Sequence, residues 1–256
     1  MRNLLYISKL FIFIFLWASP TQIWAQKDIK GKPENLPFLH FSYALTQPAG
    51  TLKERFGLNS NIGGSVFYKT SKNFLFGAES SFMFSRQVKE KDLLKGISSD
   101  EGEIFDQDSR ISQVILFQRG FTLTASVGKL FPIIGPNPNS GLLVKLGGGF
   151  MQHKIRVEHQ NNRIPQLEGD YKKGYDRLTN GPMLSQFLGY MHMSNNKLIN
   201  FMVGFECVQG FTQSRRSFNF DTRQADTRKR LDILYGVRLG WSISLYKRTS
   251  NNFYYD

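Results

Sequence analysis

Three residues of this chain carry the side chains that a serine hydrolase needs. His192 and Ser194 are separated by one residue, and Glu206 follows twelve residues after Ser194. In such an arrangement the histidine takes the proton from the serine hydroxyl, and a carboxylate orients the histidine. Ser194 is therefore a candidate nucleophile, His192 a candidate base and Glu206 a candidate orienting acid. The competing interpretation is a tight polar turn, because Asn195-Asn196 follows directly.

A second group of candidates consists of charged residues inside otherwise apolar or small-residue stretches. Charges that leave water must be paired or solvated, because an isolated buried charge is costly. Three roles fit them: a structural network of ion pairs, a narrow path for ions, or a catalytic carboxylate. The ion-pair network is the preferred interpretation. The residues are Glu79, Lys145, Glu206, Asp232 and Arg238, with His40 in the same polar phase.

Other common kinds of site are not indicated. No Lys-Ser/Thr pair and no helix follow Gly147-Gly148-Gly149, so this run favours close packing of a strand over a phosphate loop. Cys207 is the single cysteine, so no intrachain disulfide can form, and we expect it to be an inert lipid-facing residue. The four histidines and one cysteine have no metal-ligand spacing. We expect neither a metal nor another cofactor.

The segment 231–245 is the clearest of the elements that must position these residues. Every second residue from Leu231 to Leu245 is apolar or aromatic, and the intervening residues are mostly small, polar or charged. A period of two predicts a strand with one apolar and one polar face. Soluble strands are typically about five or six residues long, whereas a strand that crosses a membrane needs about 9–11. This pattern is typical of a transmembrane β-strand.

The same alternation recurs seven times before this segment, and the connections alternate in length. Those after the second, fourth and sixth segments are short, and the others are longer. The sequence therefore predicts an all-β fold, an eight-stranded antiparallel transmembrane β-barrel with short periplasmic turns and longer extracellular loops. A secreted β-sandwich, with shorter strands, is the alternative. The seven segments are 39–46, 62–69, 74–85, 121–128, 142–153, 182–193 and 199–210.

An eight-stranded barrel has an interior just wide enough to be filled by side chains. The charges in the polar phase of the strands would then point into this narrow space. If the last hairpin is centred near Thr222, Glu206 lies opposite Arg238. We therefore predict an ion pair between these two residues inside the barrel.

The N-terminus predicts export. Arg2 and Lys9 precede a short apolar run, 10–17, and a cleavage point after Ala25 would define residues 1–25 as a signal peptide. We expect a flexible periplasmic lead at 26–37, the barrel at 38–248 and a C-terminal tail at 249–256. The formal net charge is +13. For an exported chain, such a charge favours contact with anionic lipid or glycan over nucleic acid. The expected location is the outer membrane of a Gram-negative cell.

Charge is sorted among the expected outer loops. Segment 87–109 is acidic, 214–230 is basic, and 169–177 mixes tyrosines with charges. The loops could simply be solvated or pair with one another. They could also form a docking surface for protein, or hold lipopolysaccharide phosphates, which arginine binds in a bidentate manner. The candidate docking residues are Tyr171, Lys172, Lys173, Arg177, Arg215, Arg216, Arg223 and Arg228.

The His192-Met193-Ser194-Asn195 segment resembles outer-membrane lipid A 3-O-deacylases. The resemblance covers about fifteen residues and implies a hydrolase with Ser194, His192 and Glu206 in the roles given above. This chain lacks the Ala-Gly that follows the asparagine in that family. The alternation of loop lengths also puts Ser194 at a periplasmic turn, whereas lipid A occupies the outer leaflet.

The mature chain as a whole resembles small outer-membrane β-barrels of the Bacteroidota type. The resemblance rests on the short lead, on Phe56-Gly-Leu-Asn59-Ser-Asn61-Ile-Gly63 and on Gly236-x-x-x-Gly240-Trp241. It implies an outer-membrane location and, for several such barrels, an accessory role in type IX secretion. We therefore expect a non-enzymatic barrel that binds partners in protein secretion or envelope assembly. A lipid A deacylase-like hydrolase and a narrow channel are the alternatives.

Overall fold

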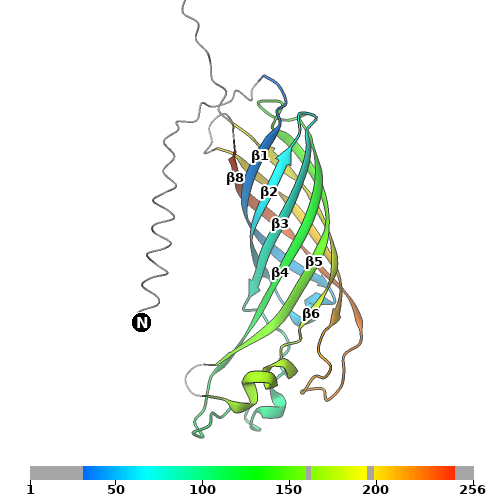
Figure 1. The fold of residues 1–256 in the computed structure, drawn as a ribbon. Helices are drawn as coiled ribbons and strands as arrows, with labels where there is room; N and C mark the ends of the chain where they lie inside the picture. Colours follow the sequence, from blue (N-terminus) through cyan, green and yellow to red (C-terminus); the bar gives the residue numbers. More distant parts are fainter. Residues whose placement is uncertain (1–30, 160–162, 195–198, 246–256) are drawn as a thin grey trace, which may run out of the picture. The chain divides into compact units, whose positions relative to one another are not determined.

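The computed structural model describes residues 31–159, 163–194 and 199–245. Within these residues, eight antiparallel strands form one closed ring (Figure 1), in which β8 pairs with β1. This ring confirms the predicted all-β, eight-stranded barrel. The expected signal peptide (1–25) and tail (249–256) lie outside the described residues. The strands are β1 (Leu36–Gly50), β2 (Asn59–Lys69), β3 (Phe74–Ser85), β4 (Val114–Phe131), β5 (Gly141–His159), β6 (Thr179–His192), β7 (Phe201–Ser214) and β8 (Lys229–Ser244).

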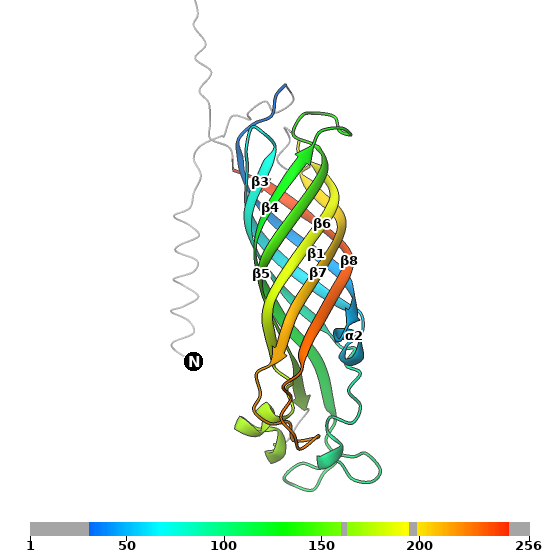
Figure 2. The ribbon, with the colours of Figure 1, turned by 90° about the vertical axis from the view of Figure 1, so that its right-hand side faces the viewer.

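The two ends of the barrel carry connections of different length. The connections 70–73 and 132–140 lie at one end, which we call the turn end. The connections 51–58, 86–113 and 215–228 lie at the other end, the loop end, together with residues 163–178 (Figure 2). The helical turns α2 (Leu52–Arg55), η1 (Lys95–Ile97), η2 (Pro165–Leu167) and η3 (Gly169–Gly174) all belong to the loop end. Among the described residues, no helix has the length and apolar character needed to span a membrane.

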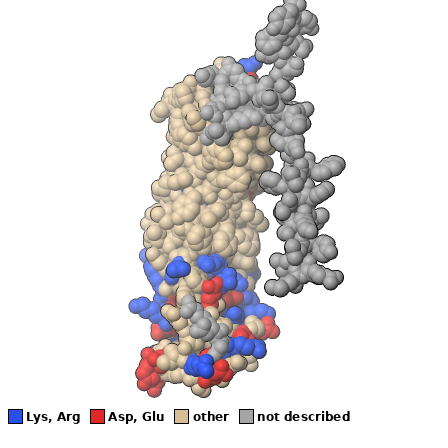
Figure 3. All heavy atoms as spheres, turned by 90° about the vertical axis from the view of Figure 1, so that its left-hand side faces the viewer, with Lys and Arg blue, Asp and Glu red and all other residues tan. Residues whose placement is uncertain are grey.

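Side chains alternate between the lumen and the exterior along every strand, as the pleat of a strand requires. On the face shown in Figure 3, charged residues gather at the loop end, and the surface over the middle of the barrel lacks them. Large apolar side chains cover that exterior instead. Examples from all eight strands, each 39–56% exposed, are Phe41, Ile62, Val66, Phe76, Leu123, Leu146, Leu188, Val203, Phe205, Val237 and Leu239.

The polarity of the two faces reverses along β5. Near the turn end, the outward positions are apolar, as at Leu146, and Lys145 points inward. Beyond His153 the outward positions become charged, as at Arg156, and the inward Ile155 is fully buried. The predicted strand ended at His153 because the apolar alternation changes phase there. The backbone ladder with β4 nevertheless continues to His159.

The Gly147–Gly149 run lies within β5 and brings neighbouring strands close together. A Cβ atom on Gly147 would lie 2.6 Å from both Thr124 Cγ2 and Ser185 Oγ. A Cβ atom on Gly149 would collide with the backbone of Leu123 in β4. Glycine is needed here because any side chain would push the strands apart.

Candidate functional site

A buried lysine and the chain's own lead close the turn end. Lys69 Nζ is buried and donates to Asn139 Oδ1 at 2.7 Å and to the Glu34 carbonyl at 3.3 Å. Asn139 also donates to the Lys32 carbonyl (2.9 Å) and accepts from the Glu34 amide (3.0 Å). The sequence predicted a flexible lead. Its described part is instead tied to the β4–β5 turn, because it supplies oxygens to a lysine that has left water.

Two ion pairs cross the middle of the lumen. Lys145 Nζ lies 2.6 Å from Glu79 Oε1, and Arg238 Nη2 donates to Glu206 Oε2, also at 2.6 Å. Arg238 Nη1 donates in addition to Ser42 Oγ at 2.7 Å. The cavity lined by Glu79, Glu206 and Arg238 has a volume of about 20 Å³. That is room for about one water molecule, so side chains fill this level of the lumen.

The Glu206–Arg238 contact forms through an offset in strand register. The register pairs Glu206 with Gly236, and Arg238 with Gly204. The two residues are therefore diagonal neighbours and not directly opposite, as the centring of the hairpin had placed them. Their long side chains span the offset, and the opposing glycines leave room for them.

Asp232 is the centre of a third cluster, which lies inside the barrel next to the loop end. Its carboxylate accepts from Thr51 Oγ1 (2.7 Å) and from Thr212 Oγ1 (2.5 Å), and Arg55 Nη2 lies 3.4 Å away. His153 Nε2 lies 2.9 Å from it, and because an ionised carboxylate only accepts, that nitrogen carries a proton. Asp232 and His153 are fully buried. Arg55 has no signal in the sequence, because α2 is too short to produce a periodic pattern.

The Asp232–His153 pair has the orientation of an acid–base pair, but no hydroxyl or thiol of a described residue is hydrogen-bonded to the other ring nitrogen. His153 Nδ1 is buried and has no hydrogen-bond partner among the described residues. Phe56 packs edge-on against the ring, with centroids 5.8 Å apart. The pair contacts α2 and its flanking residues, through Thr51 and Arg55 at Asp232 and through Phe56 at His153.

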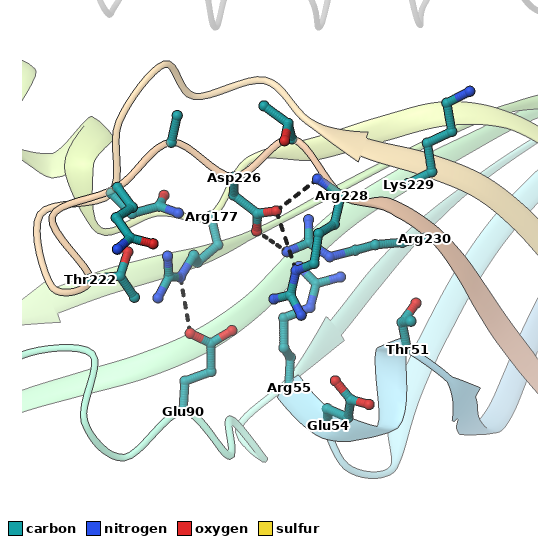
Figure 4. A pocket seen from close by; sticks show the side chains of 14 residues that line it. Thr51, Glu54, Arg55, Glu90, Arg177, Thr222, Asp226, Arg228, Lys229 and Arg230 are labelled. Atoms are coloured by element: carbon teal, nitrogen blue, oxygen red, sulfur yellow. Dashed lines mark hydrogen bonds and ion pairs between the residues drawn. The ribbon is translucent and has the colours of Figure 1, made fainter.

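A polar pocket of about 520 Å³ lies on the loop side of this cluster, between α2 and the loop that precedes β8. Figure 4 shows Arg177 directed towards Glu90, and Asp226 between Arg228 and Arg230. The pocket is lined by five basic residues, Arg55, Arg177, Arg228, Lys229 and Arg230, and by three acidic ones, Glu54, Glu90 and Asp226.

Several of the expected docking residues connect the outer loops to each other. Arg177 Nε donates to Glu90 at 3.0 Å, and Nη2 of the same residue pairs with Asp221, so one arginine joins three loops. Arg216 forms a bidentate pair with Asp176, and this hydrogen bonding raises the pKa of the Arg216 guanidinium. These arginines connect the loops, and their guanidinium groups are already paired with carboxylates of the chain.

Other expected docking residues remain accessible. Tyr171 is 61% exposed, and the side chain of Arg228 is 80% exposed. Tyr171 packs beside Phe220, with ring centroids 6.3 Å apart, and Phe218 lies 6.1 Å from the same ring. We call Tyr171, Phe218 and Phe220 the aromatic patch; Arg223, which is exposed, belongs to the same loop as the two phenylalanines. The sequence interpretation missed both phenylalanines, although Phe218-Asn-Phe220 stands out in an otherwise basic loop.

The remaining docking residues are partly engaged. Lys173 pairs with Asp170 at 2.5 Å, and Lys172 is half-buried. Arg215 donates from Nε to Asn180 Oδ1 at 2.5 Å on the outside of the barrel. Lys173 and Arg215, like Arg177 and Arg216, are therefore engaged by neighbouring side chains.

The three candidate catalytic residues are not brought together. His192 stacks on Phe201, with ring centroids 5.2 Å apart, and β7 pairs Phe201 with His192. Ser194 lies just beyond β6 at the turn end. Glu206 points into the middle of the lumen, where it pairs with Arg238. In the described part of the chain, no group of His, Cys, Asp and Glu side chains could hold a metal ion.

The strand register defines a closed eight-stranded antiparallel barrel. Comparison with solved structures finds low similarity to the following proteins. Ail, the attachment invasion locus protein of Yersinia pestis, has a TM-score of 0.40 and 10% identity, over 82% of this chain and 99% of Ail. The N-terminal β-barrel domain of Pseudomonas aeruginosa OprF has a TM-score of 0.35 and 9% identity, over 82% of this chain and 100% of that domain. OprG of the same species has a TM-score of 0.37 and 11% identity, over 84% of this chain and 99% of OprG. The likeness is limited to the general barrel. No protein-family model matches the chain, and no curated protein matches it.

Proposed function

We propose that this chain is a non-enzymatic outer-membrane β-barrel whose outer loops bind a partner protein of the envelope or of the secretion machinery. The observation that carries the proposal is the combination of an apolar exterior, a filled lumen and cross-linked outer loops. Each of these features supports a different part of the proposal.

The apolar exterior supports the membrane location. A soluble barrel would place its apolar residues inside, whereas here Phe41, Val66 and Leu239 lie outside and ion pairs lie inside. The reversal along β5 would mark the outer edge of the hydrocarbon layer, since lysine and arginine replace apolar residues outside the barrel there. The protein is expected in the outer-membrane fraction and should migrate faster on gels before heating than after. Recovery of the mature chain as a soluble monomer would contradict this location.

The filled lumen argues against transport. Glu79–Lys145 and Glu206–Arg238 occupy the middle, and Lys69 and Asp232 close the two ends. In planar bilayers, the purified protein should give no single-channel steps. Regular steps in the wild-type protein, absent from a heat-denatured sample, would favour the narrow channel instead.

The outer loops support partner binding. The Arg177 network and buried side chains such as Ile164 and Leu167 give the loops a fixed arrangement without the partner. The aromatic patch consists of tyrosine and phenylalanine, and the same loops carry exposed arginines such as Arg223 and Arg228. All three residue types are enriched at protein interfaces. The surrounding arginines favour a partner with an acidic contact surface.

Site-specific crosslinking in living cells tests this surface. A photo-reactive amino acid in place of Tyr171 should capture one discrete partner, and Phe220→Ala should weaken the capture. The matched control is the same amino acid at Ile111, which is 63% exposed on another outer loop. Equal capture from both positions would indicate random collision and would overturn the docking surface.

The identity of the captured partner tests the biological process. The resemblance to Bacteroidota barrels favours a component of type IX secretion, and mass spectrometry of the crosslinked band would identify it. The hydrolase alternative is tested separately by Ser194→Ala. Unchanged acylation of lipid A in cells with this variant is the expected result.

A further inference from the structure

A groove lies on the outside of the barrel where β6, β7 and β8 reach the loop end. It has a volume of about 440 Å³. Its walls are outward-facing residues of three adjacent strands, including Pro182 of β6, Phe211 of β7 and Leu231 of β8. Phe211 and Leu231, paired across β7 and β8, are 49% and 42% exposed. The groove is therefore continuous with the apolar exterior of the barrel.

The groove forms where the ladder between β6 and β7 is interrupted. Pairing runs from Asn180–Gln213 to Met183–Gly210 and omits the residues between them. Pro182 lies in this gap and has no amide hydrogen to donate to β7. Proline thus leaves a recess on the exterior at this level.

Basic side chains line the part of the groove that is nearest the loop end. The charged residues among its lining are Arg215, Lys229 and Arg230, and none of the lining residues is acidic. Arg230 is already engaged by Asp226, on the lumen side of the strand. Arg215 and Lys229 are exposed; Lys229 lies in the outward phase of β8, and Arg215 directly follows the last residue of β7.

The two exposed cations are available for a ligand. Arg215 Nε donates to Asn180 Oδ1, which fixes the orientation of the guanidinium group. Among the described residues Lys229 has no ion-pair partner, and Figure 4 shows its side chain pointing away from the Asp226 cluster. An apolar wall below two cations is complementary to an amphiphile with an anionic head.

We propose that this groove binds the phosphate group of an outer-leaflet phosphoglycolipid, the lipid A part of lipopolysaccharide. The phosphate lies between Arg215 and Lys229, and an acyl chain lies along Pro182, Phe211 and Leu231. The proposal rests on the proposed outer-membrane location, which puts this groove at the boundary between hydrocarbon and headgroups. Arginine suits this ligand because its planar group can form two parallel hydrogen bonds to phosphate.

The same level of the barrel offers a matched control. Lys154 and Arg156 face outward on β5, also where the exterior becomes charged, and they do not line the groove. Arg156 is paired with Glu158 at 2.7 Å. Removing these two residues changes the net charge as much as removing Arg215 and Lys229.

The test is native mass spectrometry of the full mature chain, refolded in detergent and titrated with diphosphorylated lipid A. Arg215→Ala with Lys229→Ala should weaken binding about tenfold or more, because it removes the charge-assisted hydrogen bonds to the phosphate. Lys154→Ala with Arg156→Ala should weaken it by less than about threefold, because these residues do not line the groove and contribute only a screened long-range attraction. Enzymatically dephosphorylated lipid A should bind the wild-type protein no better than it binds the groove variant. All variants must first give the heat-dependent gel shift, which verifies folding.

Three outcomes would overturn the proposal. Equal losses in both double variants would mean a general basic collar with no specific site. If dephosphorylated lipid A bound the wild-type protein as tightly as diphosphorylated lipid A does, the groove would make only an apolar contact with the lipid. Displacement of lipid A by inorganic phosphate at equal concentration would mean a free-anion site without a role for the acyl chain. In each case a normal gel shift and membrane fractionation would leave the outer-membrane location standing, so the two proposals fail separately.

Discussion

The lumen and the outer loops both contain enclosed ion pairs, but their surroundings differ. The Arg238 and Arg177 side chains are both 11% exposed, one in the lumen and the other among the loops. In the lumen, the closed ladder of strands fixes the distance between partners, so a charge that loses its partner has nowhere to go. In the loops no ladder holds the backbone, so an orphaned charge can move into water. Similar burial should therefore give very different energetic consequences.

The largest effect is expected from Asp232→Asn. The substitution keeps the size of the side chain but leaves the buried Arg55 without its ion-pair partner. We expect the free energy of unfolding to fall by about 3–5 kcal/mol, measured by urea unfolding in detergent. Asp226→Asn, which removes a loop carboxylate, is the matched control and should cost less than about 1 kcal/mol. Equal losses would erase the distinction between lumen and loops.

The next largest effect is expected from Glu206→Gln. It should cost about 3 kcal/mol, and somewhat less than Asp232→Asn because Arg238 retains its hydrogen bond to Ser42. The double variant Glu206→Leu with Arg238→Met should be more stable than the single variant, because it leaves no unpaired charge. A double variant less stable than Glu206→Gln would mean that the ion pair makes a net contribution to the stability of the barrel, in addition to avoiding an unpaired charge.

A smaller effect on stability, but a larger one on local order, is expected from Arg177→Ala. The unfolding free energy should change by less than about 1 kcal/mol, because the barrel ladder does not depend on this residue. Loops 86–113 and 215–228 lose their common partner, so limited proteolysis should cut them about tenfold faster. Arg228→Ala is the control, since its side chain is already 80% exposed. Unchanged proteolysis in Arg177→Ala would show that the apolar contacts alone order the loops.

The smallest effect concerns pH and Asp226. Burial alone would raise the pKa of this carboxyl group, but Arg230 and Arg228 outweigh burial and hold the pKa below its usual range. Because the pKa of Asp226 is lower in the folded loop than in the unfolded chain, the ionised carboxylate stabilises the folded loop at pH values above the ordinary pKa of about 4. That stabilisation is lost as the pH falls through the lowered pKa. Protection of 215–228 from an acid-active protease should therefore decline below about pH 4, and the decline should be shallower in Asp226→Asn.

The strands and their faces could be predicted because period two is a local property of the sequence. That pattern predicted eight strands and put Glu79, Lys145 and Arg238 in the polar phase. Register is not local, so Glu206 was placed opposite Arg238 although the ladder offsets them by two residues. The polarity reversal also hid the last part of β5, since a strand that leaves a membrane changes its apolar face.

The loop end was the least predictable part of the molecule. Arg55 and Phe220 lie in segments whose composition reads as solvated, and only the arrangement of several loops buries or clusters them. The basic character of 214–230 was visible in the sequence, but not which arginines would be consumed internally. Arg216 of this segment and Arg177 of segment 169–177 are engaged because their partners, Asp176 and Asp221, come from other loops. Such pairings depend on tertiary structure that composition does not encode.

The Asp232 cluster has a consequence for the order in which the molecule is assembled. Thr51 and Arg55 directly follow the first strand of the barrel, whereas Asp232 belongs to the last strand. Asp232 can therefore hold α2 at the mouth of the barrel only after β8 has paired with β1. This pairing has the longest separation in sequence of all the strand pairs, so it is expected late in folding. Until that moment, Arg55 has no carboxylate to hold it. The time at which α2 becomes resistant to proteolysis during refolding would thus report the closure of the barrel and not the earlier strand pairings.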